Sequence, residues 1–521
     1  ISKYTFSKHL SQIPINNKDL IFPPLKKVAA VERARGISST LSQLPLICCI
    51  LILAIFSIGC TSQEANETSE STPELSQPNI IVLLADDLGY GDLSSYGSQS
   101  IETPHLDSLA AMGARFTQFY SGSAVCSPSR ACLLTGKFPL RFDVRQHFRD
   151  SVDHLPTSTQ TLPEMLGEAG YATAHIGKWH LGGLRLSDIE RRQQGREAIP
   201  GPLQHGFDHY LTNTEGAPIR PRLIQERKLY REGGKYLLRN DEQAPTINKH
   251  WTEIKVDDAI GLIDGWQAVD QPFFLNLWFD VPHTPYEPAP EPHLSKYQAL
   301  GAEGDQLYFR SMVSHLDAQI GRLISHLKET GLMENTFIVF TSDNGPAYEG
   351  SPGPFKGGKT DLHEGGIRVP MFAVWPGHIP ANQHRFQPMH MADLLPTIAN
   401  VAEVDEIPND LDGVNMLPVL MNEQSVVERG PLLWQMDLYR HFQNQGPKPT
   451  PYATSVALDG KWKLLTDSLQ PTELFNLAQD HRELYNLKGQ HPEVEEKLLN
   501  AIQDFHQAPR ESWKAVPIGK Y

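Results

Sequence analysis

The sequence predicts an α/β fold, in which a large domain with a mostly parallel central sheet flanked by helices precedes a smaller domain with an antiparallel sheet and a helix. Short apolar strands alternate along the chain with amphipathic helices, a pattern typical of parallel sheets. Four of these strands are mostly apolar and do not alternate strictly with polar residues, which is typical of strands buried on both faces. After about residue 428 the pattern changes to closely spaced strands, which predicts the smaller domain.

The individual elements have clear start and stop signals. One helix begins at Thr103-Pro104 and stops at Gly113, because proline is favoured at the first helical position and glycine just past the last. A long amphipathic helix over about 305–330 carries its leucine, isoleucine and valine residues on one side, and Gly331 ends it. The apolar strands are predicted over 80–85, 172–176, 273–279 and 337–341, and the smaller domain over strands 452–458, 461–466 and 473–477 and a helix near 492–505.

The chain divides by composition into five parts. The first is interpreted as a non-native upstream extension, because the chain begins with Ile1 and has no methionine before Met112. A signal peptide, a flexible linker rich in Ser, Thr, Glu and Pro, the large domain and the C-terminal subdomain follow. The boundaries of the five parts are 1–30, 31–60, 61–77, 78–428 and 429–521.

A basic and then apolar segment predicts export. Arg33 and Arg35 precede the uncharged, largely apolar run 44–59, which ends directly before Cys60. Small residues before a cysteine are typical of a bacterial lipoprotein cleavage site, where Cys60 would become the lipidated first residue. The alternatives are an ordinary signal peptide and an uncleaved anchor. We therefore expect a periplasmic or cell-surface protein whose only membrane contact is a lipid at Cys60.

The charge of the chain excludes one class of partner. Its formal net charge is −15, and the first 60 positions, with seven Lys and Arg against two Asp and Glu, carry +5, so the remainder carries −20. Such a surface argues against nucleic acid as a partner. An anionic ligand would have to be held by a local cationic pocket. A locally basic stretch at 185–239 is either the lining of a cleft or a solvated loop.

Polar residues follow each of the four apolar strands of the large domain. Ligands bind beyond the carboxyl ends of the strands in open parallel sheets, so these residues are expected to share one site. Carboxylate and amide oxygens suit calcium or magnesium, whereas zinc favours histidine and cysteine. The oxygen donors are Asp86, Asp87, Asp343 and Asn344, and the cations and imidazoles are Lys178, His180 and His283.

Cys126 is the most informative single residue. The run from Cys126 to Gly136 places a cysteine at a helix start, with Pro128 in the first turn and Gly136 as the stop. Free N–H groups at such a position favour an anion. A buried structural thiol, a generic catalytic thiol and a disulfide with Cys132 remain as alternatives.

The run Cys126-Ser-Pro-Ser-Arg130 through Thr-Gly136 resembles the signature of type I, formylglycine-dependent sulfatases of the alkaline-phosphatase superfamily, in particular the arylsulfatase A and N-acetylgalactosamine-6-sulfatase branches. The likeness covers 79 to about 487, and no core motif departs from the family pattern. The supporting stretches are 85–92, 177–182, 342–345, 359–368 and 473–477. The resemblance implies an alkaline-phosphatase-like large domain that hydrolyses sulfate esters.

The resemblance also implies roles for individual residues. Cys126 would be oxidised to formylglycine by a maturation enzyme, and the hydrate would supply the nucleophile and a ligand to one calcium ion. Arg130 would orient the hydrate, and His180 and His283 would transfer protons. The remaining metal ligands would be Asp86, Asp87, Asp343 and Asn344, and the sulfate-binding residues would be Lys178 and Lys359.

Two other functions remain as alternatives. One is a phosphate or phosphonate ester hydrolase, which would favour a Ser or Thr nucleophile and two metals with several histidine ligands. The other is a surface lipoprotein that binds sulfated glycans without turning them over. The expected partner is a sulfated small molecule or glycan. No role is assigned to His105, His147 or His326, and His363 and Arg368 are interpreted as structural.

Overall fold

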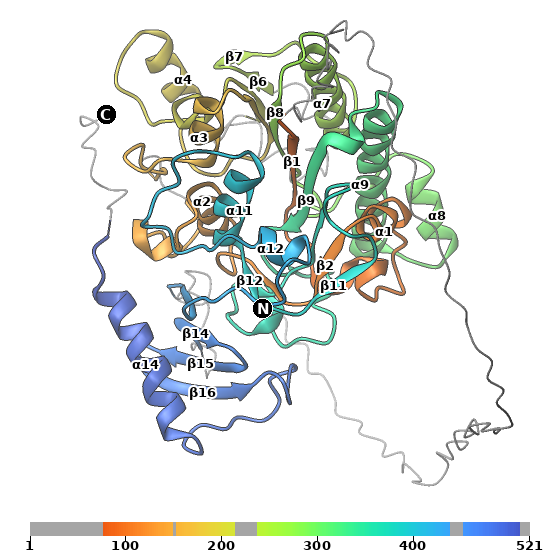
Figure 1. Ribbon diagram of the computed structural model, residues 1–521. Helices are drawn as coiled ribbons and strands as arrows, with labels where there is room; N and C mark the ends of the chain where they lie inside the picture. Colours follow the sequence, from red (N-terminus) through yellow and green to blue (C-terminus); the bar gives the residue numbers. More distant parts are fainter. Residues whose placement is uncertain (1–76, 149–152, 214–236, 438–451, 511–521) are drawn as a thin grey trace, which may run out of the picture. The chain divides into compact units, whose positions relative to one another are not determined.

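The computed structural model describes residues 77–148, 153–213, 237–437 and 452–510 (Figure 1). All of them belong to one compact unit, 73–521. The upstream extension, the signal peptide with Cys60 and nearly all of the linker lie outside the described residues. Among the described helices, none is long and apolar enough to cross a membrane.

The central sheet has ten strands in the order β11-β2-β10-β9-β1-β8-β4-β5-β6-β7. Its middle is parallel, from β9 through β1, β8 and β4 to β5, and antiparallel pairs occur toward both edges. This confirms the predicted mostly parallel sheet. The middle strands are β9 (Thr336–Ser342), β1 (Asn79–Ala85), β8 (Phe273–Trp278), β4 (Ala172–Gly177) and β5 (His209–Asn213). The others are β2 (Ala114–Phe116), β6 (Leu237–Arg239), β7 (Glu242–Gln243), β10 (Met371–Val374) and β11 (Gln383–Arg385).

Strand β1 shows why this part of the chain forms the middle of the sheet. All seven of its residues are buried, and alternate residues enter two separate apolar clusters. Ile80, Val82 and Leu84 face one cluster, whereas Ile81 and Leu83 face the other. This is the period-two geometry of a strand covered on both faces.

Helices cover both faces of the sheet (Figure 1). One side holds α1 (Pro104–Ala111), α7 (Trp251–Gln267) and α9 (Gly304–Glu329), and the last of these matches the long predicted helix within one residue at each end. The other side holds α2 (Cys126–Thr135), α3 (Leu162–Glu168) and α11 (Leu394–Val401). The remaining short elements are α4 (Leu186–Gln193), α8 (His293–Ala299), α10 (Glu364–Ile367), α12 (Leu417–Leu420), β3 (Phe119–Tyr120) and β12 (Met389–His390).

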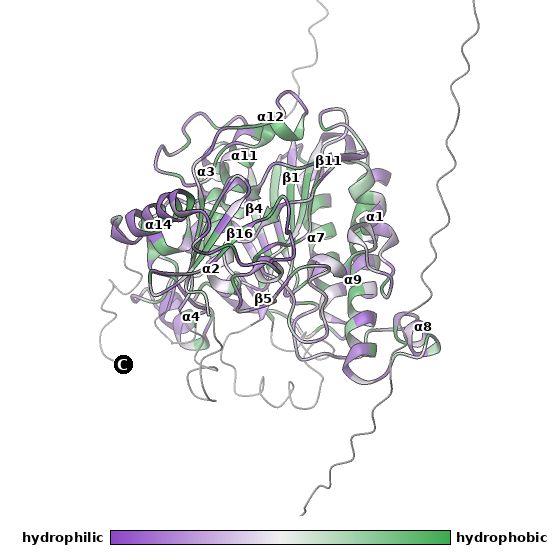
Figure 2. Cartoon of the chain, turned by 90° about the horizontal axis from the view of Figure 1, so that it is seen from below, coloured by the Kyte–Doolittle hydropathy of each residue, from purple (hydrophilic) through white to green (hydrophobic). Residues whose placement is uncertain are grey.

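The C-terminal part is an antiparallel sheet with one helix, as predicted, but the sheet has four strands, and the strand over 432–435 was not among the predicted ones. Leu498, Ile502 and Phe505 are buried residues of the helix, which contacts β14 and β15 and is largely purple along its exposed side in Figure 2. Apolar residues of this sheet belong to the same cluster as those of α2 and α11, so a division of the chain at residue 428 stays a prediction. The elements are β13 (Leu432–Gln435), β14 (Ser455–Asp459), β15 (Trp462–Asp467), β16 (Gln470–Asn476) and α14 (Pro492–Gln507).

The register of the parallel strands brings the predicted polar residues to one edge. Ala85 pairs with Ser342 of β9, and Trp278 of β8 pairs with both Leu84 and Gly177. Because these residues lie at the carboxyl ends of their strands, the next residues along each chain segment leave the sheet together.

Candidate active site

Cys126 is the first residue of α2, as the sequence predicts. Val125 before it is extended, with φ −148°, and Gly136 ends the helix at φ 65° with its N–H donating to the Cys132 carbonyl at 3.0 Å. The left-handed φ at this stop favours glycine. Cys126 and Cys132 are both buried free thiols, so the 126–132 disulfide is not formed. Burial raises the pKa of the Cys126 thiol to about 12, although Lys178 and Lys359 oppose the shift.

Four of the predicted residues form one cluster of ligand atoms. One donor atom each from Asp86, Asp87, Cys126 and His283 lies within 4.8 Å of the others. The Cys126 Sγ is 3.5 Å from Asp86 Oδ1, and the His283 Nε2 is 3.6 Å from Asp87 Oδ2. Residues that follow β1 and β8 therefore meet the first residue of α2.

Asp343 and Asn344 lie next to this cluster and fix the turn at Asp87. Asp87 has φ 63°, a left-handed conformation that is uncommon for a residue other than glycine. Its N–H donates to Asp343 Oδ1 at 3.2 Å, and Asn344 Nδ2 donates to Asp87 Oδ1 at 2.7 Å. These two bonds hold the strained turn in place.

Arg130 lies one turn along α2 from Cys126 and is fully buried. Its Nη2 and Nε donate to Asp343 Oδ2 at 2.8 and 3.1 Å, and its Nη1 donates to the Lys178 carbonyl at 2.7 Å. The guanidinium also lies 5.2 Å from the ring centre of Trp278. Burial and the nearby Asp86 raise the pKa of Asp343 to about 6, although Arg130 opposes the shift. Arg130 is thus a cation held in a fixed position one helical turn from Cys126.

Two lysines lie against the carboxylates of the cluster. Lys178 Nζ is 2.6 Å from Asp86 Oδ2 and 3.6 Å from Cys126 Sγ. Lys359 Nζ is 2.7 Å from Asp87. Burial alone would raise the pKa of Asp86, but Lys178, His283 and Arg130 hold that pKa well below its usual range. Both carboxylates are therefore ionised at neutral pH.

The two predicted histidines have different surroundings. His283 Nδ1 lies 2.5 Å from the Thr284 carbonyl, and burial with Lys359 nearby lowers the pKa of His283. His180 has φ 58°, and its buried Nδ1 has no hydrogen-bond partner among the described residues. Burial, Lys178 and His147 lower the pKa of His180 well below its usual range.

His147 is a neighbour of the site that the sequence analysis missed. Its ring centre lies 5.9 Å from that of His180. Its loop follows α2 and carries no strand or helix pattern, so no signal in the sequence placed it there.

The basic stretch at 185–239 is in part neutralised, since Arg192 pairs with Asp241 at 2.6 Å. Arg220, Arg222, Arg227, Lys228 and Arg231 lie outside the described residues.

The donor atoms fit a hard divalent cation. Asn344 Oδ1 is buried and has no hydrogen-bond partner among the described residues, which leaves one oxygen ready for a ligand. The carboxylates of Asp86 and Asp87 are within the same cluster. Calcium takes carboxylate and amide oxygens of this kind. Cys126 was expected at the metal site, as its formylglycine derivative, whereas His283, a zinc-type ligand, was expected only as a proton-transfer residue.

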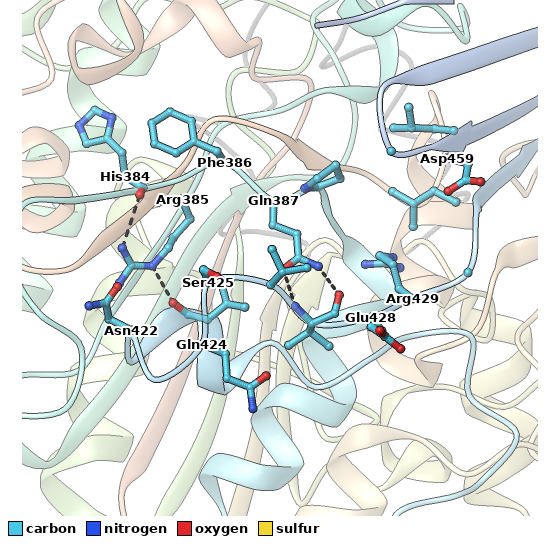
Figure 3. Close-up of a pocket in the computed structure, with 18 residues that line it drawn as sticks. His384, Arg385, Phe386, Gln387, Asn422, Gln424, Ser425, Glu428, Arg429 and Asp459 are labelled. Carbon is cyan, nitrogen blue, oxygen red and sulfur yellow. Dashed lines mark hydrogen bonds between the residues drawn. The ribbon is translucent and has the colours of Figure 1, made fainter.

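A pocket of about 750 Å³ lies elsewhere, against β11 and the turn between β14 and β15 (Figure 3). Arg385 in its wall donates to the carbonyls of Val419 and Leu420, and Gln387 exchanges hydrogen bonds with Val427. None of the predicted site residues lines it. The chemistry described above therefore belongs to the edge of the central sheet and not to this pocket.

The fold is that of the alkaline-phosphatase-like class of hydrolases, and the site is an acid cluster at the strand ends beside the buried Cys126. The chain belongs to the sulfatase family, a family of sulfuric ester hydrolases, whose model matches residues 78–404. A second model, described as N-sulphoglucosamine sulphohydrolase, C-terminal, matches residues 358–508.

Named relatives agree with this family. N-acetylgalactosamine-6-sulfatase of Canis lupus familiaris is 37% identical over 369 residues, which are 67% of this chain and 66% of the relative. Arylsulfatase A of Homo sapiens is 32% identical over 485 residues, 85% of this chain and 89% of the relative. The crystal structure of Ps i-CgsB in complex with k-i-k-neocarrahexaose matches with a TM-score of 0.70 and 28% identity, covering 84% of this chain and 94% of that one.

Proposed function

We propose that the protein hydrolyses the sulfate esters of a sulfated carbohydrate, with a formylglycine hydrate made from Cys126 as its nucleophile and one bound calcium ion. The observation that carries the proposal is the position of Cys126. It lies buried at a helix start, with Asp86 Oδ1 at 3.5 Å and Lys178 Nζ at 3.6 Å from its sulfur. A hydroxyl in place of this sulfur would lie between a metal-ligating carboxylate and a cation.

The proposed metal ligands are Asp86, Asp87, Asp343, Asn344 and the oxygen that replaces the Cys126 sulfur. Loss of the sulfur on conversion to formylglycine removes a zinc-type ligand and leaves a predominantly oxygen donor set. When bound, calcium would polarise the sulfate ester and lower the pKa of the attacking hydroxyl.

As its hydrate, formylglycine would supply one hydroxyl that attacks the sulfur atom of the sulfate ester. The second hydroxyl could then expel the bound sulfate and restore the aldehyde, which a serine cannot do. The chain's own residues prepare this position. Arg130 is fixed by Asp343 and the Lys178 carbonyl, so it can hold the hydrate without moving. Preorganised donors of this kind are effective because they need no rearrangement during the reaction.

Lys178 and Lys359 are proposed to bind the sulfate oxygens. Each ammonium group already contacts one of the two adjacent carboxylates, Asp86 or Asp87, on the metal side of the site. An anion that enters between them gains two buried cations. This arrangement supplies the local attraction that the acidic surface lacks.

His180 and His283 are proposed to carry the two proton transfers, one at the nucleophile and the other at the leaving oxygen. Burial lowers the pKa of both imidazoles, so both are neutral at neutral pH and each can accept a proton. The imidazole at the leaving oxygen must therefore take up a proton from solvent before it can donate one. A proton delivered to the leaving oxygen offsets the negative charge that develops there as the ester bond breaks.

A carbohydrate substrate is supported by the relatives, whose names refer to a sulfated amino sugar and, in one complex, to a neocarrahexaose. The test is release of inorganic sulfate from a panel of defined sulfated saccharides by the matured full-length protein. Cys126→Ala is the matched control, and it should be inactive while remaining folded. Release of phosphate from phosphate monoesters without release of sulfate from any sulfate ester would overturn the proposal.

A further inference from the structure

The segment that carries Lys359, residues 356–368, also forms backbone hydrogen bonds to two other parts of the site. The Thr360 N–H donates to the Ala124 carbonyl at 2.9 Å, two residues before the nucleophile position. The Gly345 N–H, directly after Asn344, donates to the Gly366 carbonyl at 2.9 Å. Any shift of this segment would therefore move Lys359 and disturb two neighbouring parts of the site.

The opposite side of the same segment is bound to the C-terminal sheet through His363. Its Nδ1 lies 2.6 Å from Asp361 Oδ1, and its Nε2 lies 2.7 Å from Glu473 Oε2 on β16. The His363 and Glu473 side chains are 4% and 8% exposed. Lys356, at the start of the segment, contacts the second oxygen of Glu473 at 3.0 Å.

A second buried contact lies beside the first. Lys463 of β15 is 2.9 Å from Glu364 and 2.9 Å from Glu483, and all three side chains are fully buried. The Glu364 N–H also donates to Glu483 Oε2 at 2.7 Å. The segment is thus attached to the C-terminal sheet at two successive residues, 363 and 364.

The charge of His363 decides how strong its attachment is. Burial opposes protonation, but the hydrogen bonds to Asp361 and Glu473 raise the pKa of His363 to about 9. Glu483 faces it as well, and Lys356 faces it only through Glu473. A neutral imidazole has one N–H and can satisfy only one of the two carboxylates, whereas the cation satisfies both.

We propose that His363 is a positioning residue for Lys359, because as a cation between Asp361 and Glu473 it fixes the 356–368 segment to β16. The C-terminal sheet then helps to position a sulfate-binding residue, in addition to packing against the large domain. This inference rests on the proposed role of Lys359 in binding sulfate.

The test is a double-mutant cycle in the matured full-length protein, with 4-nitrophenyl sulfate as the probe. His363→Gln should lower kcat/KM about tenfold, the order expected for a lost hydrogen bond to a charged group. Lys359→Ala should lower it further, and the loss in the double variant should fall well short of the product of the two single losses, since His363 acts mainly through Lys359. His326→Gln is the matched control, because His326 also pairs with a carboxylate, Asp264 at 2.8 Å, but on α9. It should leave kcat/KM unchanged.

The pH profile provides the second readout. In the wild type, kcat/KM should fall as the pH rises through about 9, and this alkaline limb should be absent from His363→Gln. If that variant does not fold, Glu473→Gln carries the test, and its alkaline limb should move to lower pH. The inference would be overturned if the alkaline limb of the kcat/KM profile stayed at the wild-type pH in the variant. It would also be overturned if the kcat/KM losses of the two single variants multiplied fully in the double variant. A Lys359→Ala variant with wild-type kcat/KM would instead refute the proposed role of Lys359.

Discussion

Lys178 and Asp86 form a buried ion pair beside Cys126. Their Nζ and Oδ2 atoms are 2.6 Å apart, and the two side chains are 13% and 1% exposed. The same ammonium group lies 3.6 Å from the Cys126 sulfur. One cation therefore neutralises a proposed metal ligand and also faces the position where sulfate would be transferred.

Lys178→Met tests this double role. The variant should lower kcat/KM for a sulfate ester at least about 100-fold, because it removes a preorganised cation from the reacting group. It should also lower the free energy of unfolding of the metal-free protein by about 3 kcal/mol, since Asp86 is left as a buried charge with fewer partners. Steady-state kinetics and urea denaturation measure the two effects. Kinetics within twofold of the wild type would show that Lys178 does not contact the sulfate.

Removal of calcium should abolish activity. The prediction rests on the carboxylates of Asp86 and Asp87 and on the neighbouring buried Oδ1 of Asn344, which has no hydrogen-bond partner among the described residues. Elemental analysis of active protein should find about one calcium ion per chain, and activity lost to a chelator should return with calcium but not with zinc. Stoichiometric zinc in the active enzyme, with turnover that survives loss of calcium, would contradict the metal assignment.

The stability of the fold should depend on pH through His363. Its pKa is raised from 6.5 to about 9, so the stabilisation is fully present below about pH 6.5 and is lost as the pH rises through about 9. A shift of this size corresponds to about 3 kcal/mol. The melting temperature of the wild type should therefore decrease as the pH is raised from 7 to 9.5. The melting temperature of His363→Gln should change less over the same range. Identical profiles for the two proteins would rule out this source of stability.

Lys463 should contribute far more to stability than an exposed lysine that also forms an ion pair. Lys463→Met leaves Glu364 and Glu483 buried without their shared cation, and we expect a loss of about 3–5 kcal/mol in the free energy of unfolding. Lys497→Met is the matched control, because Lys497 is 72% exposed and forms its ion pair with Asp459 at the surface. It should change stability by less than about 1 kcal/mol. Equal losses in the two variants would show that burial of the network is not what stabilises it.

The sequence was informative where the chemistry lies at the ends of apolar strands. Asp86, Lys178, His283 and Asp343 each follow such a strand, and parallel pairing brings the strand ends to one edge of the sheet. The start and stop of α2 were equally clear, because Gly136 is a conventional stop signal.

Contacts between distant segments could not be predicted in the same way. His363 and Glu473 are 110 positions apart and lie on different elements, so neither local propensity nor periodicity relates them. The proximity of His147 to His180 depends on the path of a loop. The antiparallel pairing of the short strands β2 and β10 was also missed, because three or four residues carry too little pattern.

The most direct test of the account is the mass of the tryptic peptide that contains residue 126. Trypsin cleaves after Arg115 and Arg130, so the peptide 116–130 contains Cys126 and no other cysteine. The account predicts that active protein yields this peptide lighter by the exchange of a CH₂SH group for an aldehyde, and that the converted fraction rises in proportion to sulfatase activity. Cys132, in the next peptide, should remain a thiol. Full activity from protein whose residue 126 is an unmodified thiol would contradict the mechanism.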